Sequence, residues 1–346
     1  MAIPSESHHE QLIGDHLEAG LRVATWLHVE RIGDNLVART ELGRTRRLVL
    51  AGHTDTVPAN GNAEAVVDGD MLHGVGSADM KSGLAVFLEL ARTVSEPVVD
   101  VTYVFYAGEE VHARYNGLAH LFAERPELVT GDVAILGEPT DGWIEAGCQG
   151  TMRFEVTLVG ERAHTARPWM GRNAVHRMGR VLEVLDAYEA RRPVVDGCEF
   201  REALQAVRVD GGVANNVVPD RAVLTINHRV APDRTLAEAE AHVREVLAPA
   251  LAAGDEVIVA AADPPAVPGL DRPLLRALVE RSGLPVRAKL GWTDVARFSE
   301  HGIPAVNLGP GDPNIAHTTD ECVERSKLDA VHAALLDLLT TPESGA

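Results

Sequence analysis

The chain has 346 residues, 45% of them hydrophobic and 24% charged, which is long enough for two domains with separate cores and excludes a disordered or fibrous protein. Its 51 acidic side chains outnumber the 32 basic ones, and the formal charge of −19 argues against nucleic acid or an anionic membrane surface as a partner. No apolar run reaches the roughly 18 residues that span a bilayer, and three widely spaced cysteines are typical of reduced thiols, so we expect a cytoplasmic protein.

The first stretch with a chemical signature is LVLAGHTD, which predicts a buried strand that ends at His53 and Asp55. Two residues apart in extended chain, these side chains point the same way, so the imidazole can bind a metal while the carboxylate holds its other ring nitrogen. Taken alone the motif is weak, because a histidine and a turn aspartate also end many strands. Before it, the pattern predicts one helix and two strands: Ser5–Leu21, Val23–Glu30 and Asn35–Thr40.

Carboxylates follow the next predicted elements in the same way. Asp79 stands in the loop GVGSADMKSG just ahead of an apolar, buried helix, where an isolated aspartate would be explained by helix capping. One predicted strand, residues 98–107, runs into Glu109 and Glu110, and the next, residues 133–137, runs into Glu138. Because open α/β sheets bind ligands at the carboxyl ends of their strands, this repetition favours one site.

From residue 151 apolar and polar residues alternate, which is typical of strands with one solvent-exposed face and predicts a second sheet. Its order, β-α-β-β-α-β, is that of a ferredoxin-like module. Its first helix is expected to bury Val175, Met178, Leu182 and Leu185, and its second, Thr235–Leu247, to be capped by Asp233. The predicted strands begin at Thr151 and cover 204–211, 222–230 and 256–261.

After the proline-rich linker 263–268 the first pattern resumes, so the module is an insertion. We expect a metal-binding catalytic domain over 1–150 and 265–346 and an inserted domain over 151–264. The resumed part contains His317, six residues after a Gly-Pro-Gly loop. Its predicted elements are the helices Pro273–Arg281, Thr293–His301 and Lys327–Leu339 and the strand Ala305–Leu308.

The candidate site combines two imidazoles with four carboxylates and no thiolate, which suits zinc or a similar divalent ion with open positions. Five of these residues divide into two metal sites if one carboxylate bridges, and the remaining glutamate is then a general base. The set comprises His53, Asp79, Glu109, Glu110, Glu138 and His317.

The motifs GHTDTVP, GVGSADMKSG, GEE and GEPT and the late histidine resemble, in order and spacing, the two-zinc aminoacylase and carboxypeptidase family over almost the whole chain. The resemblance implies a zinc-peptidase-like mixed, largely parallel sheet flanked by helices, with an inserted ferredoxin-like lid and dimerisation domain. It also implies two divalent metal ions, zinc or else cobalt, and a cis peptide after Asp79. The implied ligands are His53 and Glu138 for one ion, Glu110 and His317 for the other, and Asp79 as the bridge. Glu109 is implied as the general base, with Asp55 supporting the site.

Most of the candidate substrate contacts lie in the predicted inserted domain. His164 resembles the family histidine that reaches the neighbouring subunit's site, which predicts a homodimer, although a lone loop histidine is more often structural. Arg229 and Asn216 resemble residues that hold substrate carboxylates. Arg167 is a candidate on its chemistry, or else a solvated arginine, and Thr293 at a predicted helix start either binds a carboxylate or is a plain N-cap.

The resulting hypothesis is an amidohydrolase of an anionic N-acyl amino acid. The resemblance favours a succinyl group, and the nearest alternative is an amidohydrolase of the same build that removes another acyl group, such as acetyl. The competing hypothesis from another class is a metal-binding relative without catalysis. The presence of Glu109 argues against that alternative, because such a relative would lack the general base.

Overall fold

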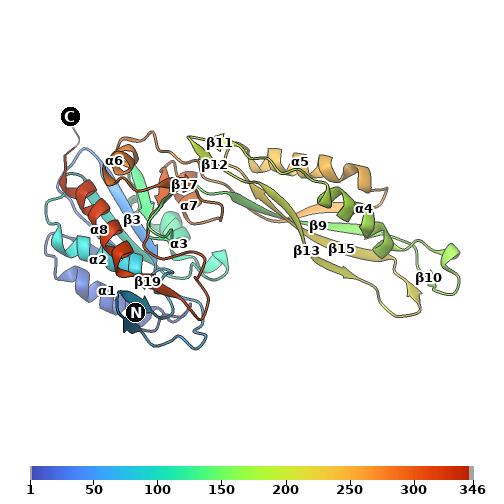
Figure 1. Cartoon of the computed structure of the whole chain (residues 1–346), viewed down its shortest axis with the longest axis horizontal. Helices are drawn as coiled ribbons and strands as arrows, with labels where there is room; N and C mark the ends of the chain where they lie inside the picture. Colours follow the sequence, from blue (N-terminus) through green and yellow to red (C-terminus); the bar gives the residue numbers. More distant parts are fainter. Residues whose placement is uncertain (1, 343–346) are drawn as a thin grey trace. The chain divides into compact units, whose positions relative to one another are not determined.

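The computed structural model describes residues 2–342, which form two compact units (Figure 1). Among the described residues, the first unit comprises 2–147, 268–288 and 297–342, and the second comprises Cys148–Val267 and Lys289–Ala296. Along the chain the second unit is thus inserted into the first. No helix within residues 2–342 is both long and apolar enough to cross a membrane.

The first unit is built on an eight-stranded mixed sheet. Its strands are His28–Ile32 (β1), Asn35–Arg39 (β2), Arg47–His53 (β3), Asp100–Tyr106 (β6), Val133–Leu136 (β7), Ile144–Ala146 (β8), Val286–Ala288 (β17) and Ala305–Asn307 (β18). They lie in the order β1-β2-β6-β3-β7-β18-β8-β17, and the central strands β6, β3, β7 and β18 are parallel. All residues of β6 and β7 are buried, as expected for parallel strands covered by helices. The predicted α/β architecture is confirmed.

The helices of this part of the chain are Gln11–Arg22 (α1), Lys81–Thr93 (α2), Gly117–Glu124 (α3), Pro273–Ser282 (α6), Val295–Glu300 (α7) and Arg325–Thr340 (α8). Helix α2 packs against β3 and β6 and lies between α1 and α8 (Figure 1). Its burial on most sides agrees with the apolar sequence after Ser82. A Cβ on Gly83 would lie 2.3 Å from the Gly137 carbonyl oxygen, so only glycine permits this approach. The approach brings the loop before α2 to the end of β7.

The second unit contains a four-stranded antiparallel sheet in the order β13-β15-β9-β16. Its strands and helices are Gly150–Val159 (β9), Ala174–Asp186 (α4), Ala203–Gly211 (β13), Arg221–Val230 (β15), Leu236–Leu247 (α5) and Glu256–Asp263 (β16). This is the predicted β-α-β-β-α-β order, and it confirms the inserted ferredoxin-like fold. Alternate residues of β9 and β15 pack with both helices into one core, which explains their period-two pattern.

The predicted buried face of α4 is wrong by part of a turn. Met178 and Leu185 are buried, but Val175 and Leu182 are 36% and 39% exposed. The residues buried instead, Ala174 and Val181, complete a stripe of helical period with the two correct positions. Small Ala174 gave a weaker apolar signal than Val175, so the stripe was placed one residue late.

Two helix starts also differ from prediction. Helix α5 is capped by Thr235, not Asp233, through a capping box in which Thr235 and Glu238 each accept from the other's backbone amide. Helix α7 begins at Val295 and is only six residues long, so Thr293 is not at the N-terminus of the longer helix expected there. Ala296 donates its amide to the Thr293 carbonyl oxygen at 3.1 Å.

Several short elements were not predicted, because two or three residues are too few to show a period. Strands Val66–Asp68 (β4), Met71–His73 (β5) and Cys322–Glu324 (β19) form a small sheet that joins distant parts of the chain. Two further pairs are Ala163–His164 (β10) with Val217–Val218 (β14), and Val194–Val195 (β11) with Cys198–Glu199 (β12). The 3-10 turns are Ala113–Tyr115 (η1), Pro126–Leu128 (η2), Pro168–Met170 (η3) and Ala248–Ala250 (η4).

Candidate metal centre

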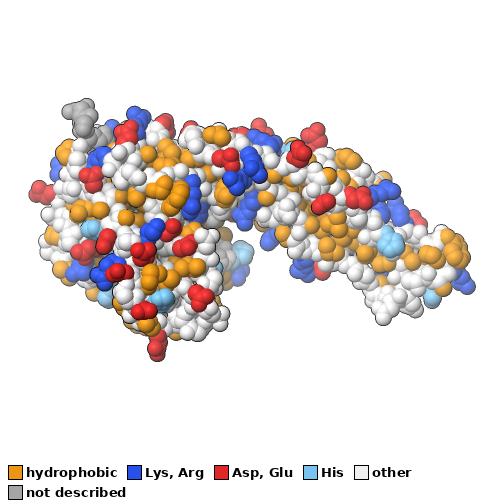
Figure 2. Space-filling view, viewed as in Figure 1, with side chains coloured by type: hydrophobic (Ala, Val, Ile, Leu, Met, Phe, Trp, Pro, Cys, Tyr) orange, Lys and Arg blue, Asp and Glu red, His pale blue; other side chains and the backbone are white. Residues whose placement is uncertain are grey.

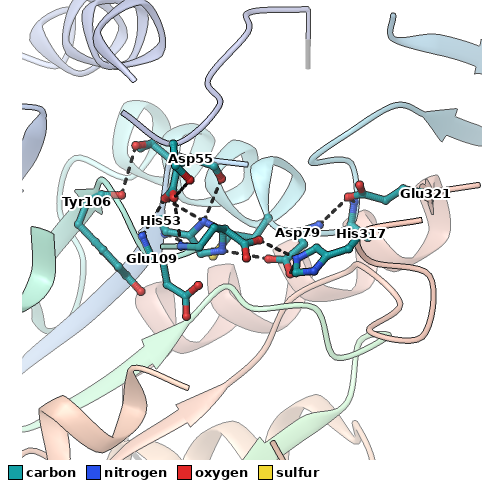
Figure 3. Close-up of polar contacts among 12 residues, drawn as sticks. His53, Asp55, Asp79, Tyr106, Glu109, His317 and Glu321 are labelled. Carbon is teal, nitrogen blue, oxygen red and sulfur yellow. Dashed lines mark hydrogen bonds and ion pairs between the residues drawn. The ribbon is translucent and has the colours of Figure 1, made fainter. Parts of the chain in front are cut away.

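The ends of three strands of the first unit, with the loops that carry Asp79 and His317, bring histidines and carboxylates together at one edge of its sheet (Figure 3). His53 is the last residue of β3, Glu109 and Glu110 follow β6, and Glu138 follows β7. Within residues 2–342, three groups have ligand atoms that all lie within 4.8 Å of one another. These groups are His53 with Asp79 and Glu138, His53 with Glu109 and Glu110, and Asp79 with Glu110 and His317.

The Asp79 carboxylate lies between two histidines and turns a different oxygen to each (Figure 3). His53 Nε2 is 2.9 Å from Asp79 Oδ1, and His317 Nε2 is 3.4 Å from Asp79 Oδ2. His317 Nε2 is also 2.8 Å from Glu110 Oε1. A carboxylate with one oxygen toward each of two ligand groups is the arrangement that a bridging ligand requires. The peptide bond between Asp79 and Met80 is cis, as the resemblance implied.

The electrostatics of this edge favour positive charge. Hydrogen bonds to Asp79 and Glu110 raise the pKa of His317 to about 10, although burial lowers it. Burial raises the pKa of Asp79, but the hydrogen bonds with His317 and His53 outweigh burial and hold that pKa below its usual value. The carboxylates therefore stabilise a cation at this position, whether a proton on an imidazole or a metal ion.

The Asp55 carboxylate accepts hydrogen bonds from three other residues next to these ligands. Its Oδ1 accepts from the Glu109 amide at 3.0 Å, and its Oδ2 accepts from the Glu110 amide at 3.1 Å and from the Ser7 hydroxyl at 2.8 Å. Burial raises the pKa of Asp55, but the His53 hydrogen bond, with those from Ser7 and Glu109, lowers it to about 2. One carboxylate thus fixes the backbone that carries both the predicted base and a predicted ligand.

The contact between Asp55 and His53 differs from the expected one. His53 Nδ1 lies 3.0 Å from the Asp55 carbonyl oxygen and 3.5 Å from its carboxylate. The carboxylate is drawn away because it already accepts from two amides and a hydroxyl. His53 is therefore oriented mainly through the Asp55 main chain, which still leaves Nε2 for the metal side of the ring.

Two backbone conformations show why these segments tolerate few other residues. Gly108 has a φ of +71°, and a Cβ there would lie 2.5 Å from the Tyr115 carbonyl oxygen, so the turn into Glu109 requires glycine. His317 has a φ of +64°, which non-glycine residues rarely adopt. Such conformations cluster at functional sites.

The predicted substrate residues all lie in the second unit, in two groups. His164 pairs with Val217 in the β10–β14 ladder, the Arg167 amide donates to the His164 carbonyl oxygen at 2.8 Å, and Thr165 donates to the Asn216 carbonyl oxygen at 3.0 Å. His164, Arg167 and Asn216 therefore share one end of this unit. Their side chains are exposed.

Arg229 and Thr293 lie at the other end of the second unit. Arg229 pairs with Thr151 at the start of β9, and the Thr293 carbonyl oxygen lies 3.8 Å from the sulfur of nearby Cys148. From Arg221, beside the His164 group, β15 extends to Arg229, which is roughly 26 Å at about 3.3 Å per residue. The two groups of one chain therefore cannot contact the same small ligand within this unit.

Sequence reasoning missed two polar residues next to the ligands, Ser7 and Glu321. Ser7 contacts Asp55, and Glu321 accepts from the Ala78 and Asp79 amides. Both contacts join segments that are distant in sequence, so no local period or motif indicated them. Glu321 follows His317 by four residues in HTTDE, and this proximity was the available signal.

The chain belongs to peptidase family M20/M25/M40, whose model matches residues 49–341. The resemblance found in the sequence is thereby confirmed, and this family is one of metal-dependent hydrolases.

Among curated proteins, the chain is 54% identical over 329 residues to a Mycobacterium tuberculosis protein named succinyl-diaminopimelate desuccinylase DapE, covering 95% of this chain and 92% of the relative. It is 44% identical over 344 residues to the succinyl-diaminopimelate desuccinylase of Corynebacterium glutamicum, covering 98% and 93%. An acetylornithine deacetylase of Klebsiella pneumoniae is more distant, at 30% identity with 84% and 78% covered.

Solved structures share the fold. A tripeptidase of Staphylococcus aureus superposes with a TM-score of 0.78 at 23% identity, covering 97% of this chain and 94% of the other. The YXEP protein of Bacillus subtilis, described as a dinuclear metal binding peptidase of the M20 family, has a TM-score of 0.69 at 18% identity, covering 97% and 93%. At these identities the likeness concerns the fold alone.

Proposed function

We propose that this protein is a cytoplasmic succinyl-diaminopimelate desuccinylase, which hydrolyses N-succinyl-LL-2,6-diaminopimelate to succinate and LL-2,6-diaminopimelate. The observation that carries the reaction is the Asp79 carboxylate between two histidines, with Glu109 in the adjoining group of ligand atoms. The substrate rests on the names of the relatives at 54% and 44% identity, both matched over nearly the whole chain.

The donor set fits two divalent ions, for which we propose zinc, with cobalt as the alternative. His53, Asp79 and Glu138 would hold one ion, and Asp79, Glu110 and His317 the other, since each group places its ligand atoms within 4.8 Å. Nitrogen and oxygen ligands without thiolate, three from the protein for each ion, suit catalytic zinc with an open position. When bound, the two ions supply Lewis acidity toward water and the amide carbonyl.

The protein's own groups then move the proton. Glu109 takes a proton from the attacking water and delivers it to the nitrogen of the departing amine as the amide bond breaks. Glu109 is suited to this task because its amide is fixed by buried Asp55 at 3.0 Å while its carboxylate lies in the group with His53. Arg229 and Asn216 are proposed to hold substrate carboxylates, and Arg167 and Thr293 are further candidates.

We further propose a homodimer in which His164 of one subunit completes the site of the other, stabilising the developing oxyanion. The separation of the His164 group from the Arg229 group along β15 supports this arrangement, because two chains can supply what one cannot. The second unit also has an unpaired edge strand, β13, at the end of its sheet. Val207 and Val209 on β13 are 58% and 53% exposed, and hydrophobic side chains gather at the surface of this unit (Figure 2).

The test is amide hydrolysis by metal-stripped protein with and without added zinc, with N-succinyl-LL-diaminopimelate and N-acetylornithine as parallel substrates. We expect zinc-dependent release of succinate and little cleavage of the acetyl compound. Cleavage of only the acetyl compound would replace the desuccinylase with an acetylornithine deacetylase of the same fold. Zinc binding without cleavage of either substrate would favour a non-catalytic relative.

A further inference from the structure

Glu321 is a buried carboxylate beside the candidate metal centre that the proposed chemistry does not use. Glu321 as a whole residue is 1% exposed. A single oxygen, Oε1, accepts from the Ala78 amide at 2.9 Å and from the Asp79 amide at 3.0 Å (Figure 3). These partners are 243 and 242 residues away in sequence, so the contact joins two distant segments at the point where Asp79 leaves the backbone.

The main chain of Glu321 is itself fixed. Its carbonyl oxygen accepts from the Gly74 amide at 3.1 Å, and the next residue, Cys322, pairs with His73 in the ladder between β19 and β5. The carboxylate therefore projects from the residue just before anchored β19 onto the loop that contains Asp79. The same short stretch carries one predicted ligand, His317, and through Glu321 contacts the backbone of another, Asp79.

The loop has no local substitute for this contact. Met80, at the N-cap position of α2, forms no side-chain capping bond, and the Ala78 and Asp79 amides lie just before the helix. Buried amides left without an acceptor are costly, so loss of Glu321 would favour rotation of the peptide that carries Asp79. Asp79 must reach His53 at 2.9 Å and His317 at 3.4 Å with different oxygens, and productive sites tolerate displacements of only about 0.5 Å.

We propose that Glu321 is a positioning residue that sets metal affinity: it holds the Ala78 and Asp79 amides so that the Asp79 carboxylate stays between the two histidines. This inference rests on the two-ion site of the proposed function and adds to it a residue that is not itself a ligand. Its effect falls on both ions, because Asp79 is shared by both ligand groups.

The test compares Glu321 with a matched buried carboxylate far from the ligands. Asp100 is 3% exposed and accepts from the Leu42 amide at 2.9 Å and the Arg44 amide at 2.8 Å, at the start of β6. The variants are Glu321→Ala, Glu321→Asp and Glu321→Gln, with Asp100→Ala and Asp100→Asn as controls. Zinc dissociation constants are measured by chelator competition, and the visible spectrum of the cobalt-loaded protein reports ligand geometry.

We expect zinc binding to weaken about 10–100-fold in Glu321→Ala, the range seen when an outer partner of a metal ligand is lost. Glu321→Asp should behave similarly, because its carboxylate is one methylene too short to reach the amides, and it serves as the test if the alanine variant does not fold. Glu321→Gln keeps the accepting oxygen and should bind within a few-fold of wild type. The Asp100 variants should lower the melting temperature but leave the zinc constants and the cobalt spectrum unchanged.

Unchanged zinc binding in Glu321→Asp and Glu321→Ala, or a loss no larger than in the Asp100 variants, would overturn the proposal. So would a Glu321→Gln variant as weak as the alanine variant, because charge rather than amide acceptance would then be responsible. The readout uses no substrate. A wild type that binds two ions without cleaving the succinyl compound would therefore refute the proposed function and leave this inference standing.

Discussion

The Asp79 carboxylate at the candidate metal centre of the first unit and the buried carboxylates of the second unit have different partners. In the second unit, Asp255 has no exposed side-chain surface and pairs with Arg177, whose Nη1 lies 2.6 Å from Asp255 Oδ1. Glu202, equally buried, pairs with Arg191 at 3.2 Å and Arg234 at 3.4 Å. In the first unit, the ion pairs of Asp79 within residues 2–342 are with histidines.

This difference distinguishes carboxylates that stabilise the fold from a carboxylate that can bind a cation. Arginine stays charged, so a carboxylate paired with it is already neutralised and contributes to the fold. Histidine can give up its proton and ligate a metal, so a carboxylate paired with histidine leaves a place for a cation from solution. Burial raises the pKa of Asp255, but the Arg177 hydrogen bonds outweigh burial and lower it. The comparison therefore predicts that the first unit holds the chemistry and the second unit supplies binding.

The largest effect should follow from Glu109→Gln, which removes the base and keeps the shape. We expect kcat to fall by about 10²–10⁴-fold, the usual contribution of a positioned general base, while zinc affinity stays close to that of wild type. Steady-state kinetics and chelator competition on the same preparation check both parts. Full activity with normal metal binding would show that another group moves the proton.

Mixing two inactive variants tests whether the second unit serves the neighbouring subunit. In a dimer of Glu109→Gln with His164→Ala, one site retains its own Glu109 and receives His164 from its partner. Random exchange makes half of all dimers mixed, each with one intact site, so activity should recover to about a quarter of wild type. No recovery, although native mass spectrometry shows mixed dimers, would place His164 within its own subunit's site.

A smaller effect should follow from Asp255→Ala, which tests the structural half of the comparison. Leaving partly buried Arg177 without its partner should cost about 3 kcal/mol in the free energy of unfolding, with unchanged zinc affinity. Because the folded-state pKa of Asp255 is lowered, its contribution is complete above the unfolded pKa of about 3.9 and is lost as pH falls below that value.

Denaturant unfolding at several pH values is the measurement. The difference between wild type and variant should be constant from about pH 5 to pH 8 and shrink below about pH 4. Asp255→Asn, which keeps most of the side-chain volume, is the matched control for packing. A change in zinc affinity in either variant would contradict the division of roles between the units.

Much of the fold follows from local patterns in the sequence. Apolar runs marked the central strands of the first sheet, and alternation marked the strands of the second. Errors arose where the deciding residue is small or the element short: Ala174 completes the buried stripe of α4, and α7 has only six residues. The three-residue strands β4, β5 and β19 show no period, and the pairing of β19 with β5 joins distant parts of the chain.

The candidate ligands could be predicted from the sequence because the strands of a parallel sheet end at a common edge. Chain order alone therefore predicted that His53, Glu110 and Glu138 converge. The contacts that support these ligands could not be predicted from the sequence. Ser7 reaches Asp55 across 48 residues, and Glu321 reaches Asp79 across 242. Such contacts depend on tertiary packing, and neither residue stands in a motif that states its role.

The central claim is that Asp79 bridges two metal ions at the edge of the first unit's sheet. Anomalous diffraction at the zinc edge from zinc-loaded crystals tests it directly. The account predicts two peaks about 3.5–4 Å apart, one beside His53 and Glu138 and the other beside Glu110 and His317, each next to a different oxygen of Asp79. A single peak, or two peaks with Asp79 bound to only one of them, would contradict it.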